Sequence, residues 1–578
     1  MKIKYITKKT FIINDGNEKG FTTGGIESKY GTILIGCDDR LTPEDISDMN
    51  LPEVKHILCC DYRRSANAGI LNFNDAEKYI HKNFHTLLTQ PELWWDDPKN
   101  RWHLYKLKND DDILAYGACE VNEITAGEII IGDIKIMAFL TPGDTDYSMS
   151  YMVEDDGIKV IFCGGLLYKG GTIPYLYRLT QNVISSWQDS DYHGFLGGIS
   201  TWKKSLELIS CADIAVPYLG GIITNLKENI KTFEKNIGEY YNYYTDISAL
   251  NYYFDDCLTI NPDTKFTPVP EKEFPPYVIH VDNQCNIVRS KSGKAIAIDN
   301  YGKHATEKLL SMIENGEIKA IDGLYITHYH DDHVDGCGYF REHFSCPIYA
   351  DKSFADILIN PQCYRFPCIS PVNVAATPLD DGYSWTWEEF EVTSFTFPGQ
   401  TLYHGGLMVK NRDNSEIVFF AGDSFTPTGI DDYCAYNRNL MIPNEGYFRC
   451  FNILKKYMPD YIINQHVDNA FYFTVEQLDL FEKNLTQRIQ ILSKLSVWEN
   501  INYALDEYFL IAYPYEQDDN DNGNDKVEIL ITDYANNVKY EIIPPKLTKS
   551  KNIYGIRIYA GEDEVYLGQK ACFIVNKK

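Results

Sequence analysis

Much of the chemistry that this sequence offers lies in one short run, His328-Tyr329-His330-Asp331-Asp332-His333. The run follows the apolar segment 321–327, which predicts a strand. Imidazole and carboxylate groups are ligands of Zn²⁺ in proteins, and a compact loop at the carboxyl end of a strand brings several of them together. A solvated, histidine-rich loop would have this spacing only rarely. The pattern H-x-H-x-D-H therefore predicts a metal site formed by His328, His330, Asp332 and His333.

The run resembles the metal-binding signature of the metallo-β-lactamase superfamily, whose members are mostly hydrolases with an αββα fold and two metal ions. Three segments elsewhere extend the resemblance, which covers residues of about 270–480. Asp423 in FFAGDS matches the aspartate that bridges the two metals, and His466 in INQHVD matches the last histidine ligand. Asp299, at the end of AIAID, matches an aspartate that supports the metal loop from behind the ligands.

The sequence departs from the family at one ligand position. Relatives usually have Pro-Gly-His-Thr where this chain has Pro398-Gly399-Gln400-Thr401. His404 follows at a position where relatives often carry a second histidine. Imidazole is the better ligand for zinc, which favours His404 as the ligand and places Gln400 beside the ligands rather than on the metal. Two alternatives stay open: the amide oxygen of Gln400 as a weaker ligand, and His404 as a hydrogen-bonding support.

The resemblance implies two metal ions in this region. One is held by His328, His330 and His404, and the other by Asp332, His333 and His466, with Asp423 between them. Two such ions lower the pKa of a bridging water toward neutrality, so that hydroxide attacks an electrophilic centre. Asp332 is then the expected proton acceptor. Zinc is expected, with iron and manganese as alternatives for the same nitrogen and oxygen ligands.

Several segments recur in the same order along the chain, at offsets of about 250–270 residues. For example, Thr141-Pro-Gly-Asp144 parallels Phe397-Pro-Gly-Gln400, and each is followed by a segment that begins with an apolar run and ends at a glycine, Gly171 or Gly429. We therefore expect two copies of one fold. At the ligand positions the first copy has Asp61, Arg63, Ser65, Ala66, Asp144, Ser148, Gly165 and Leu219. Alanine, glycine and leucine side chains do not bind Zn²⁺, so the first copy is predicted to be a metal-free scaffold.

The expected fold class is α/β: an αββα metallo-β-lactamase sandwich in two tandem copies, followed by a small C-terminal all-β sandwich. The expected domains are a degenerate, metal-free copy at 1–250, an active copy at 270–490 and an immunoglobulin-like β-sandwich at 498–578. The segment 261–276 is rich in proline and charge and is expected to link the two copies. The C-terminal domain is predicted from four alternating apolar runs that no helical pattern interrupts.

The composition limits the partners and the location of the protein. A net charge of −28 over 578 residues argues against nucleic acid as a partner. No apolar run is long enough to span a membrane, and the N-terminus lacks the features of a signal peptide. The 15 cysteines are scattered and include no CxxC, which suits reduced thiols. We expect a cytoplasmic protein that binds a small-molecule substrate; a homo-oligomer stays open.

These features favour a metal-dependent hydrolase that acts on an ester, lactone, thioester or similar small molecule. Two alternatives remain: an iron-dependent redox or dioxygenase member of the same superfamily, and a metal-binding scaffold or binding protein without catalysis. The retention of ligands in one copy and their loss in the other argue against the scaffold. The fold alone does not choose the substrate.

Overall fold

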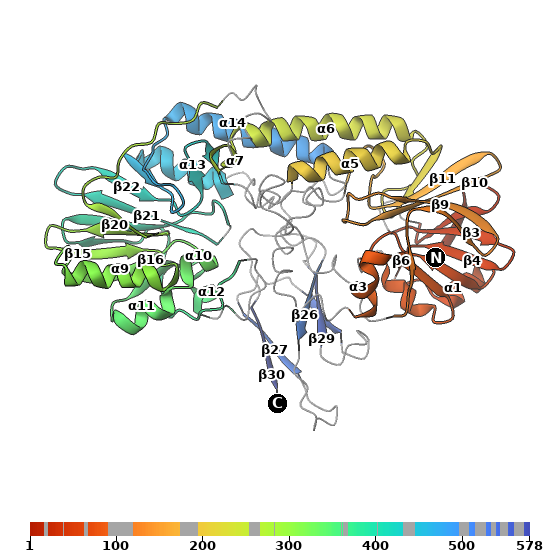
Figure 1. Ribbon diagram of the computed structural model, residues 1–578, viewed down its shortest axis with the longest axis horizontal. Coiled ribbons are helices and arrows are strands. Elements are labelled where there is room, and N and C mark those ends of the chain that lie inside the picture. The colour runs from red at the N-terminus through yellow and green to blue at the C-terminus, as the bar shows by residue number, and fades with distance from the viewer. Residues whose placement is uncertain are drawn as a thin grey trace.

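The structure is a computed structural model (Figure 1). It describes residues 1–16, 21–38, 40–62, 67–90, 119–173, 195–253, 266–282, 284–359, 361, 368–401, 403–431 and 446–495, and the backbone of five strands between 508 and 577. Two halves, each with two β-sheets, lie at opposite ends of the molecule, and long helices connect them along one side.

The first half contains a seven-stranded and a five-stranded sheet. Neighbours are antiparallel from β1 to β4 and parallel from β4 to β7. In the second sheet, β11 and β12 are parallel and the other neighbours antiparallel. The strands are, in sheet order, β1 (Lys2–Tyr5), β2 (Thr10–Asn14), β3 (Thr23–Ser28), β4 (Gly31–Ile35), β5 (Val54–Leu58), β6 (Glu77–His81) and β7 (Asn122–Ile124), then β12 (Ile214–Pro217), β11 (Ile158–Gly164), β10 (Met149–Asp155), β9 (Ile134–Leu140) and β8 (Gly127–Ile131).

The second half contains a six-stranded and a five-stranded sheet. In the first of these, two antiparallel pairs are followed by three parallel pairs, the same series as from β2 to β7. In the other, three antiparallel pairs are followed by one parallel pair, the same series as from β8 to β12. The strands are, in sheet order, β13 (Val278–Asp282), β14 (Cys285–Arg289), β15 (Lys294–Ile298), β16 (Ala320–Ile326), β17 (Ile348–Asp351) and β18 (Thr377–Leu379), then β19 (Ser384–Trp387), β20 (Phe390–Thr396), β21 (Gly405–Asn411), β22 (Ile417–Phe420) and β25 (Tyr461–Ile463).

Helices cover the outer faces of the sheets. In the first half they are α1 (Pro43–Asp48), η1 (Ala68–Asn72), η2 (Lys82–Phe84), α3 (His85–Thr89), α5 (Phe195–Ile209), α6 (Leu226–Asp246) and α7 (Leu250–Tyr253). In the second half they are α9 (Gly302–Glu314), α10 (Asp331–Val334), α11 (Cys337–His343), α12 (Ala355–Ile359), α13 (Gly446–Tyr457) and α14 (Val475–Leu495); a two-stranded ribbon, β23 (Phe425–Thr426) and β24 (Gly429–Ile430), adjoins them.

The apolar side chains of the second half form three layers of packing. One cluster lies between α9, α11 and the six-stranded sheet, and a second lies between the two sheets. The third packs α13 and α14 against the five-stranded sheet. The second half is therefore a helix–sheet–sheet–helix sandwich, the mixed α/β architecture that the sequence predicts for the metal-binding region.

The helical layers of the two halves share one hydrophobic core. This core contains Trp202 of α5 and Phe233 of α6 together with Phe451 of α13 and Phe481 of α14. Buried residues recur along α6 and α14 every three or four positions, which gives each helix one apolar face. These faces pack together, so the two halves are joined by a shared helical core (Figure 1).

The described part of the C-terminal region consists of strands. β26 (Tyr508–Pro514), β29 (Ile553–Tyr559) and β28 (Lys539–Ile543) form an antiparallel sheet, and β27 (Val527–Thr532) pairs with β30 (Cys572–Lys577). Four of these strands, β27, β28, β29 and β30, overlap the alternating runs that the sequence predicts. Their assembly into a β-sandwich stays a prediction.

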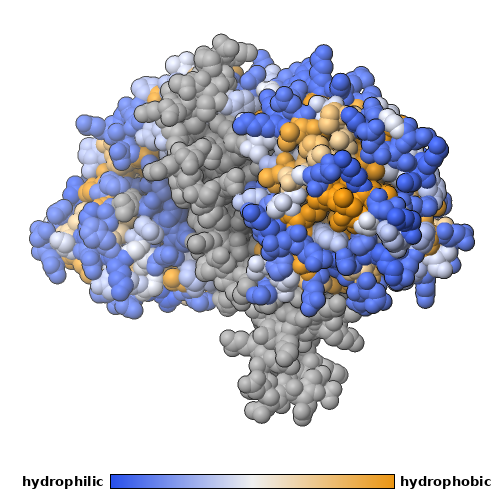
Figure 2. Space-filling model, turned by 45° about the vertical axis from the view of Figure 1, so that its right-hand side comes forward, coloured by the Kyte–Doolittle hydropathy of each residue, from blue (hydrophilic) through white to orange (hydrophobic). Residues whose placement is uncertain are grey.

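The surface is mainly hydrophilic. Figure 2 shows charged and polar side chains over most of the visible face, with an apolar area on the half that is turned forward. Among the helices that the structure describes, none is both long and apolar enough to cross a membrane.

Candidate metal centre

The sheets of the second half bring four predicted site residues together. β15 and β16 are parallel neighbours, and Asp299 and His328 follow their carboxyl ends. In the facing sheet, β22 and β25 are parallel neighbours, and Asp423 and His466 follow theirs. Parallel strands present their carboxyl ends at the same edge of a sheet, and in open α/β sheets ligands bind at that edge. The apolar packing between the sheets therefore holds these four side chains at one place.

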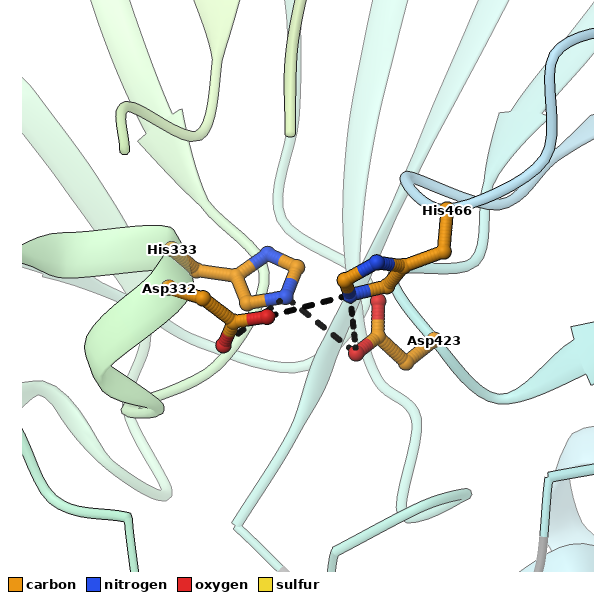
Figure 3. Close-up of side chains that lie close together, drawn as sticks. All are labelled: Asp332, His333, Asp423 and His466. Atoms are coloured by element: carbon orange, nitrogen blue, oxygen red, sulfur yellow. Dashed lines mark hydrogen bonds and ion pairs between the residues drawn. The ribbon is translucent and has the colours of Figure 1, made fainter. Parts of the chain in front are cut away.

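The H-x-H-x-D-H run forms a loop and a single helical turn after β16. Backbone pairing fixes the loop on two sides, because His328 pairs with His404 and His330 pairs with Ile369. α10 begins directly after His330 and carries Asp332 and His333. The turn projects the last two residues of the motif toward the strand ends of the facing sheet (Figure 3).

One group of converging side chains contains Asp332, His333, Asp423 and His466 (Figure 3). The Nε2 atom of His466 lies 3.1 Å from an oxygen of Asp332 and 3.1 Å from Oδ2 of Asp423. The Nε2 atom of His333 lies 3.2 Å from the same Asp423 oxygen and 3.5 Å from Asp332. Two imidazole nitrogens and two carboxylates therefore surround one point, as the ligands of a transition metal do.

A second group contains His328, His330 and again Asp423. The Nε2 atom of His328 lies 2.9 Å from Nδ1 of His330 and 3.8 Å from Oδ2 of Asp423. All three side chains are buried. The two groups share the Asp423 carboxylate.

Asp299 orients His333 from behind. Its fully buried carboxylate accepts hydrogen bonds from the backbone nitrogen and hydroxyl of Thr327 at 2.7 and 2.8 Å and from Gln465 at 3.0 Å. Its Oδ2 atom also lies 3.0 Å from Nδ1 of His333. With Nδ1–H donating to Asp299, a neutral His333 ring has its lone pair on Nε2, the atom that faces Asp423. The backbone of Asp299 has a φ of 55°, a strained conformation for a residue with a side chain.

The site separates its histidines into two electrostatic classes. Burial lowers the pKa of His328 well below its ordinary value, and burial lowers the pKa of His330 to about 4. Burial also opposes protonation of His466, but the carboxylates of Asp423 and Asp332 outweigh it and raise the pKa to about 10. The same competition, with Asp423 as the strongest carboxylate, holds the pKa of His333 well above its ordinary value. Protons on these two imidazoles thus balance the carboxylates when no cation is bound.

Several buried acceptor atoms at this place lack a donor. Within the part of the chain that the structure describes, Oδ1 of Asp423, Oε1 of Gln400 and both ring nitrogens of His404 are buried and have no hydrogen-bond partner. An unsatisfied buried oxygen costs about 1–3 kcal/mol, and more for a charged group. A cation at either position would compensate such oxygens, so the donor set fits metal ions of the kind that bind nitrogen and oxygen.

Gln400 and His404, the two candidates for one ligand position, lie in different surroundings. The Nε2 atom of Gln400 donates to Oδ2 of Asp423 at 3.2 Å. The ring of His404 stacks on that of His328, with centroids 4.6 Å apart and 17° between the planes, and no nitrogen of His404 belongs to either converging group. Burial lowers the pKa of His404 to about 3. The structure thus brings Gln400, rather than the His404 that zinc preference favours, to the shared carboxylate.

Sequence patterns did not point to Gln284. Its side-chain nitrogen lies 3.0 Å from Nδ1 of His466. Gln284 precedes β14 and is 182 residues from His466 along the chain, so no spacing signal connects the two. When Nε2 of His466 faces a cation, Nδ1 carries the proton and needs an acceptor. The amide oxygen and nitrogen of Gln284 exchange places by rotation of the amide, and the oxygen supplies that acceptor.

In the first half, other side chains occupy the positions that the sequence aligns with the candidate ligands. Arg63, Ser65 and Ala66 lie outside the described residues. The Asp144 carboxylate lies so close to Gly165 that a Cβ atom there would be 1.7 Å from Oδ2. Ser148 bonds to the backbone nitrogen of Thr145 at 3.1 Å. Among the described residues, no group of three or more histidine, cysteine or acidic side chains converges in this half.

Comparison with known proteins agrees with this geometry. Residues 301–433 match the model of the metallo-beta-lactamase superfamily. Over these residues the chain is similar to the metallo-β-lactamase superfamily. The match includes the H-x-H-x-D-H run, Gln400, His404 and Asp423, and the mixed α/β sandwich of the second half is the superfamily's fold.

The chain is also similar to curated hydrolases of this superfamily. It is 25% identical over 206 residues to a hydroxyacylglutathione hydrolase of Bdellovibrio bacteriovorus, a match that covers 34% of this chain and 74% of the relative. It is 29% identical over 131 residues to a hydroxyacylglutathione hydrolase of a Marinomonas species, covering 22% of this chain and 49% of the relative.

Solved structures of metallo-β-lactamases superpose on part of the chain. One is a B3 metallo-β-lactamase with an active-site glutamic acid, at 12% identity and a TM-score of 0.30, covering 41% of this chain and 90% of that one. Another, from Cronobacter sakazakii, has 16% identity and a TM-score of 0.30, covering 39% and 94%.

Proposed function

We propose that the chain is a metal-dependent hydrolase whose active centre holds two divalent metal ions in the second half. The observation that carries the proposal is the pair of converging donor groups that share the Asp423 carboxylate. His328 and His330 would hold one ion, and Asp332, His333 and His466 would hold the other. Zinc suits these ligands best, and iron and manganese accept the same donors.

The residues around the centre have different roles in the proposed hydrolysis. When bound, two adjacent metal ions lower the pKa of a water molecule and polarise the oxygen that is attacked. Asp332 is the proton acceptor, because its side chain is 33% exposed whereas that of Asp423 is 3% exposed. An acceptor must reach the reacting water, and a carboxylate that is open to solvent on one side does so. Asp299 keeps His333 oriented through the hydrogen bond described above.

The substrate that we propose is a small ester, lactone or thioester. The curated relatives are named as hydrolases of hydroxyacylglutathione, so an acylated glutathione thioester is the first member of this class to examine. An attacked carbonyl is common to all three bonds, and one centre of this kind serves each of them.

The test combines metal analysis with a substrate panel. The purified full-length chain should contain about two transition-metal ions per molecule. It should hydrolyse at least one compound of a panel containing an acylglutathione thioester, a carboxylic ester, a lactone and a phosphodiester. Chelation should abolish this turnover, and added Zn²⁺ or Mn²⁺ should restore it. Metal-loaded protein that hydrolyses none of the first three compounds, or that consumes O₂ with them, would contradict the proposal.

The positioning of His466 gives a second test. Gln284→Leu removes the acceptor for Nδ1 of His466 and should weaken metal binding by about 10–100-fold, as loss of such partners does in other metal sites. Gln284→Glu keeps an acceptor oxygen at the same place and should bind metal at least as tightly as wild type. Equilibrium competition with a chromogenic chelator measures both affinities. Equal weakening by the two substitutions would mean that packing, rather than the hydrogen bond, is what Gln284 contributes.

We also propose that the two halves are copies of one fold. The strand pairings described above occur in the same series, and backbone hydrogen bonds recur where the repeated segments align. Gly36, with a φ of 68°, takes the place of Asp299, and Gly164, with a φ of 58°, takes that of Gly422. The recurring bonds are Gly36–Leu58 and Asp299–Tyr325, Met149–Cys60 and Gly405–Thr327, Thr141–Ser148 and Phe397–His404, and Tyr218–Gly164 and Gln465–Gly422.

In this proposal the first copy contributes structure and no chemistry. The position of Asp423 is occupied by Gly165, and the Asp144 carboxylate fills the space beside it. The apolar packing between the sheets persists in the first copy, as it does in the second. Core packing stabilises a fold whether or not a metal is bound, so the fold can outlast its site.

A further inference from the structure

The two donor groups of the centre are unequal. The group of Asp332, His333 and His466 offers two imidazoles and a carboxylate of its own besides the shared Asp423. The group of His328 and His330 offers two imidazoles besides Asp423. A zinc ion in a catalytic site usually has three protein ligands, with an open position for water. The position at His328 and His330 therefore needs one more donor if it is to match the other in number.

His404 is badly placed to be that donor. A metal ion lies close to the plane of an imidazole that binds it. The planes of His404 and His328 are within 17° of parallel and their centroids are 4.6 Å apart, so the two planes do not meet near a shared ion. The Cε1 and Nε2 atoms of His404 lie against Gly422, where a Cβ atom would be 2.5 and 2.6 Å away from them. The His404 ring thus supports the orientation of the His328 ring by stacking.

Gln400 is well placed. Its side chain is 2% exposed, and its amide lies beside Oδ2 of Asp423, the oxygen common to both groups. Its Oε1 atom is buried without a partner among the described residues, as are both ring nitrogens of His404, so the contact with Asp423 and the ring orientation are what separate the two candidates. The backbone around Gln400 is fixed against Ser424, since a Cβ atom at Gly399 would lie 2.0 Å from the Ser424 hydroxyl. Only glycine at position 399 allows this approach, and it holds the Gln400 amide at the centre.

Building on the proposed metal centre, the geometry points to Gln400, through its amide oxygen, as the donor that the ion at His328 and His330 has in addition to the shared Asp423. His404 is then a positioning residue for His328. A neutral amide oxygen binds zinc more weakly than an imidazole or a carboxylate. The two ions consequently load in sequence: the position with Asp332, His333 and His466 fills first, and the position with Gln400 fills at higher metal concentration. The weaker position also accepts Mn²⁺ or Fe²⁺ more readily than an all-nitrogen position would.

Zinc titration of the metal-stripped, full-length chain tests this inference. Calorimetry or competition with a chromogenic chelator should resolve two classes of site in the wild type, with dissociation constants at least about tenfold apart. Gln400→His should tighten the weaker class by about tenfold or more, and Gln400→Ala should weaken it by a similar factor. The matched control is His404→Phe, which keeps a stacked ring and removes both nitrogens. It should leave both classes within about threefold of wild type.

The outcomes separate this inference from the proposed function. A His404→Phe chain that loses the weaker class, together with a Gln400→Ala chain that keeps it, would assign the ligand to His404 and overturn the inference. Two equal classes in the wild type, or a weaker class that Gln400→His leaves unchanged, would overturn it as well. A wild-type chain that binds no zinc at all would instead contradict the metal centre itself. Circular dichroism of each variant verifies that the fold is retained.

Discussion

An Asp423→Ala chain should lose both metal ions and lower turnover by about 10⁴-fold or more. Its carboxylate is the one group that both donor clusters share, so its removal weakens both positions together. The pKa of Asp423 is held well below its ordinary value, because His333 and His466 outweigh the opposing effect of burial. The group is therefore a carboxylate at every physiological pH, ready to bind cations. Elemental analysis after desalting and turnover at saturating substrate measure the two effects.

Two further variants make the interpretation specific. Asp423→Asn keeps the shape and one oxygen of the side chain but removes its charge, so it should retain more metal than Asp423→Ala and less than wild type. Asp380→Ala removes a carboxylate from an exposed surface pair with Lys352 and should change neither metal content nor turnover. A folded Asp423→Ala chain that keeps two metal ions would rule out a bridging role for this residue.

The convergence of the candidate ligands could be predicted because each follows a strong local pattern. His328, His330 and His333 come directly after an apolar run, and Asp423 and His466 do the same in other segments. Parallel strands place their carboxyl ends together whatever the details of the side chains, so the sequence pattern determines the neighbourhood. The same logic predicts the second sandwich, since helices follow β15, β16, β17, β24 and β25 along the chain.

Contacts between distant segments could not be predicted in this way. The hydrogen bond of Gln284 to His466 and that of Gln465 to Asp299 span 182 and 166 residues. Gln400 and His404 are only four residues apart, so the sequence does not show which of the two side chains points toward the centre. That depends on the path of the short loop between them. The common core of α5, α6, α13 and α14 forms where the apolar faces of helices from the two halves pack together. The sequence of one amphipathic helix does not show which other helix packs against it.

The roles of the two halves lead to the second large expected effect. Asp332→Ala should lower turnover by about 10³-fold or more, because the substitution removes a ligand and the proposed proton acceptor together, and a general base alone contributes about 10²–10⁴-fold. Asp61→Ala and Asp144→Ala change aspartates at the corresponding place in the first half. They should leave turnover within about threefold of wild type if that half is a scaffold.

The comparison of these three variants decides whether the first half takes part in the chemistry. Asp61 and Asp144 are 1% and 7% exposed, so their removal affects local packing, and metal content and thermal unfolding must be measured with turnover. A variant that loses stability but keeps turnover per folded, metal-loaded molecule fits the scaffold role. If instead Asp61→Ala or Asp144→Ala remains folded and metal-loaded and is as inactive as Asp332→Ala, the first half supplies a catalytic group. The two halves would then form one composite active site.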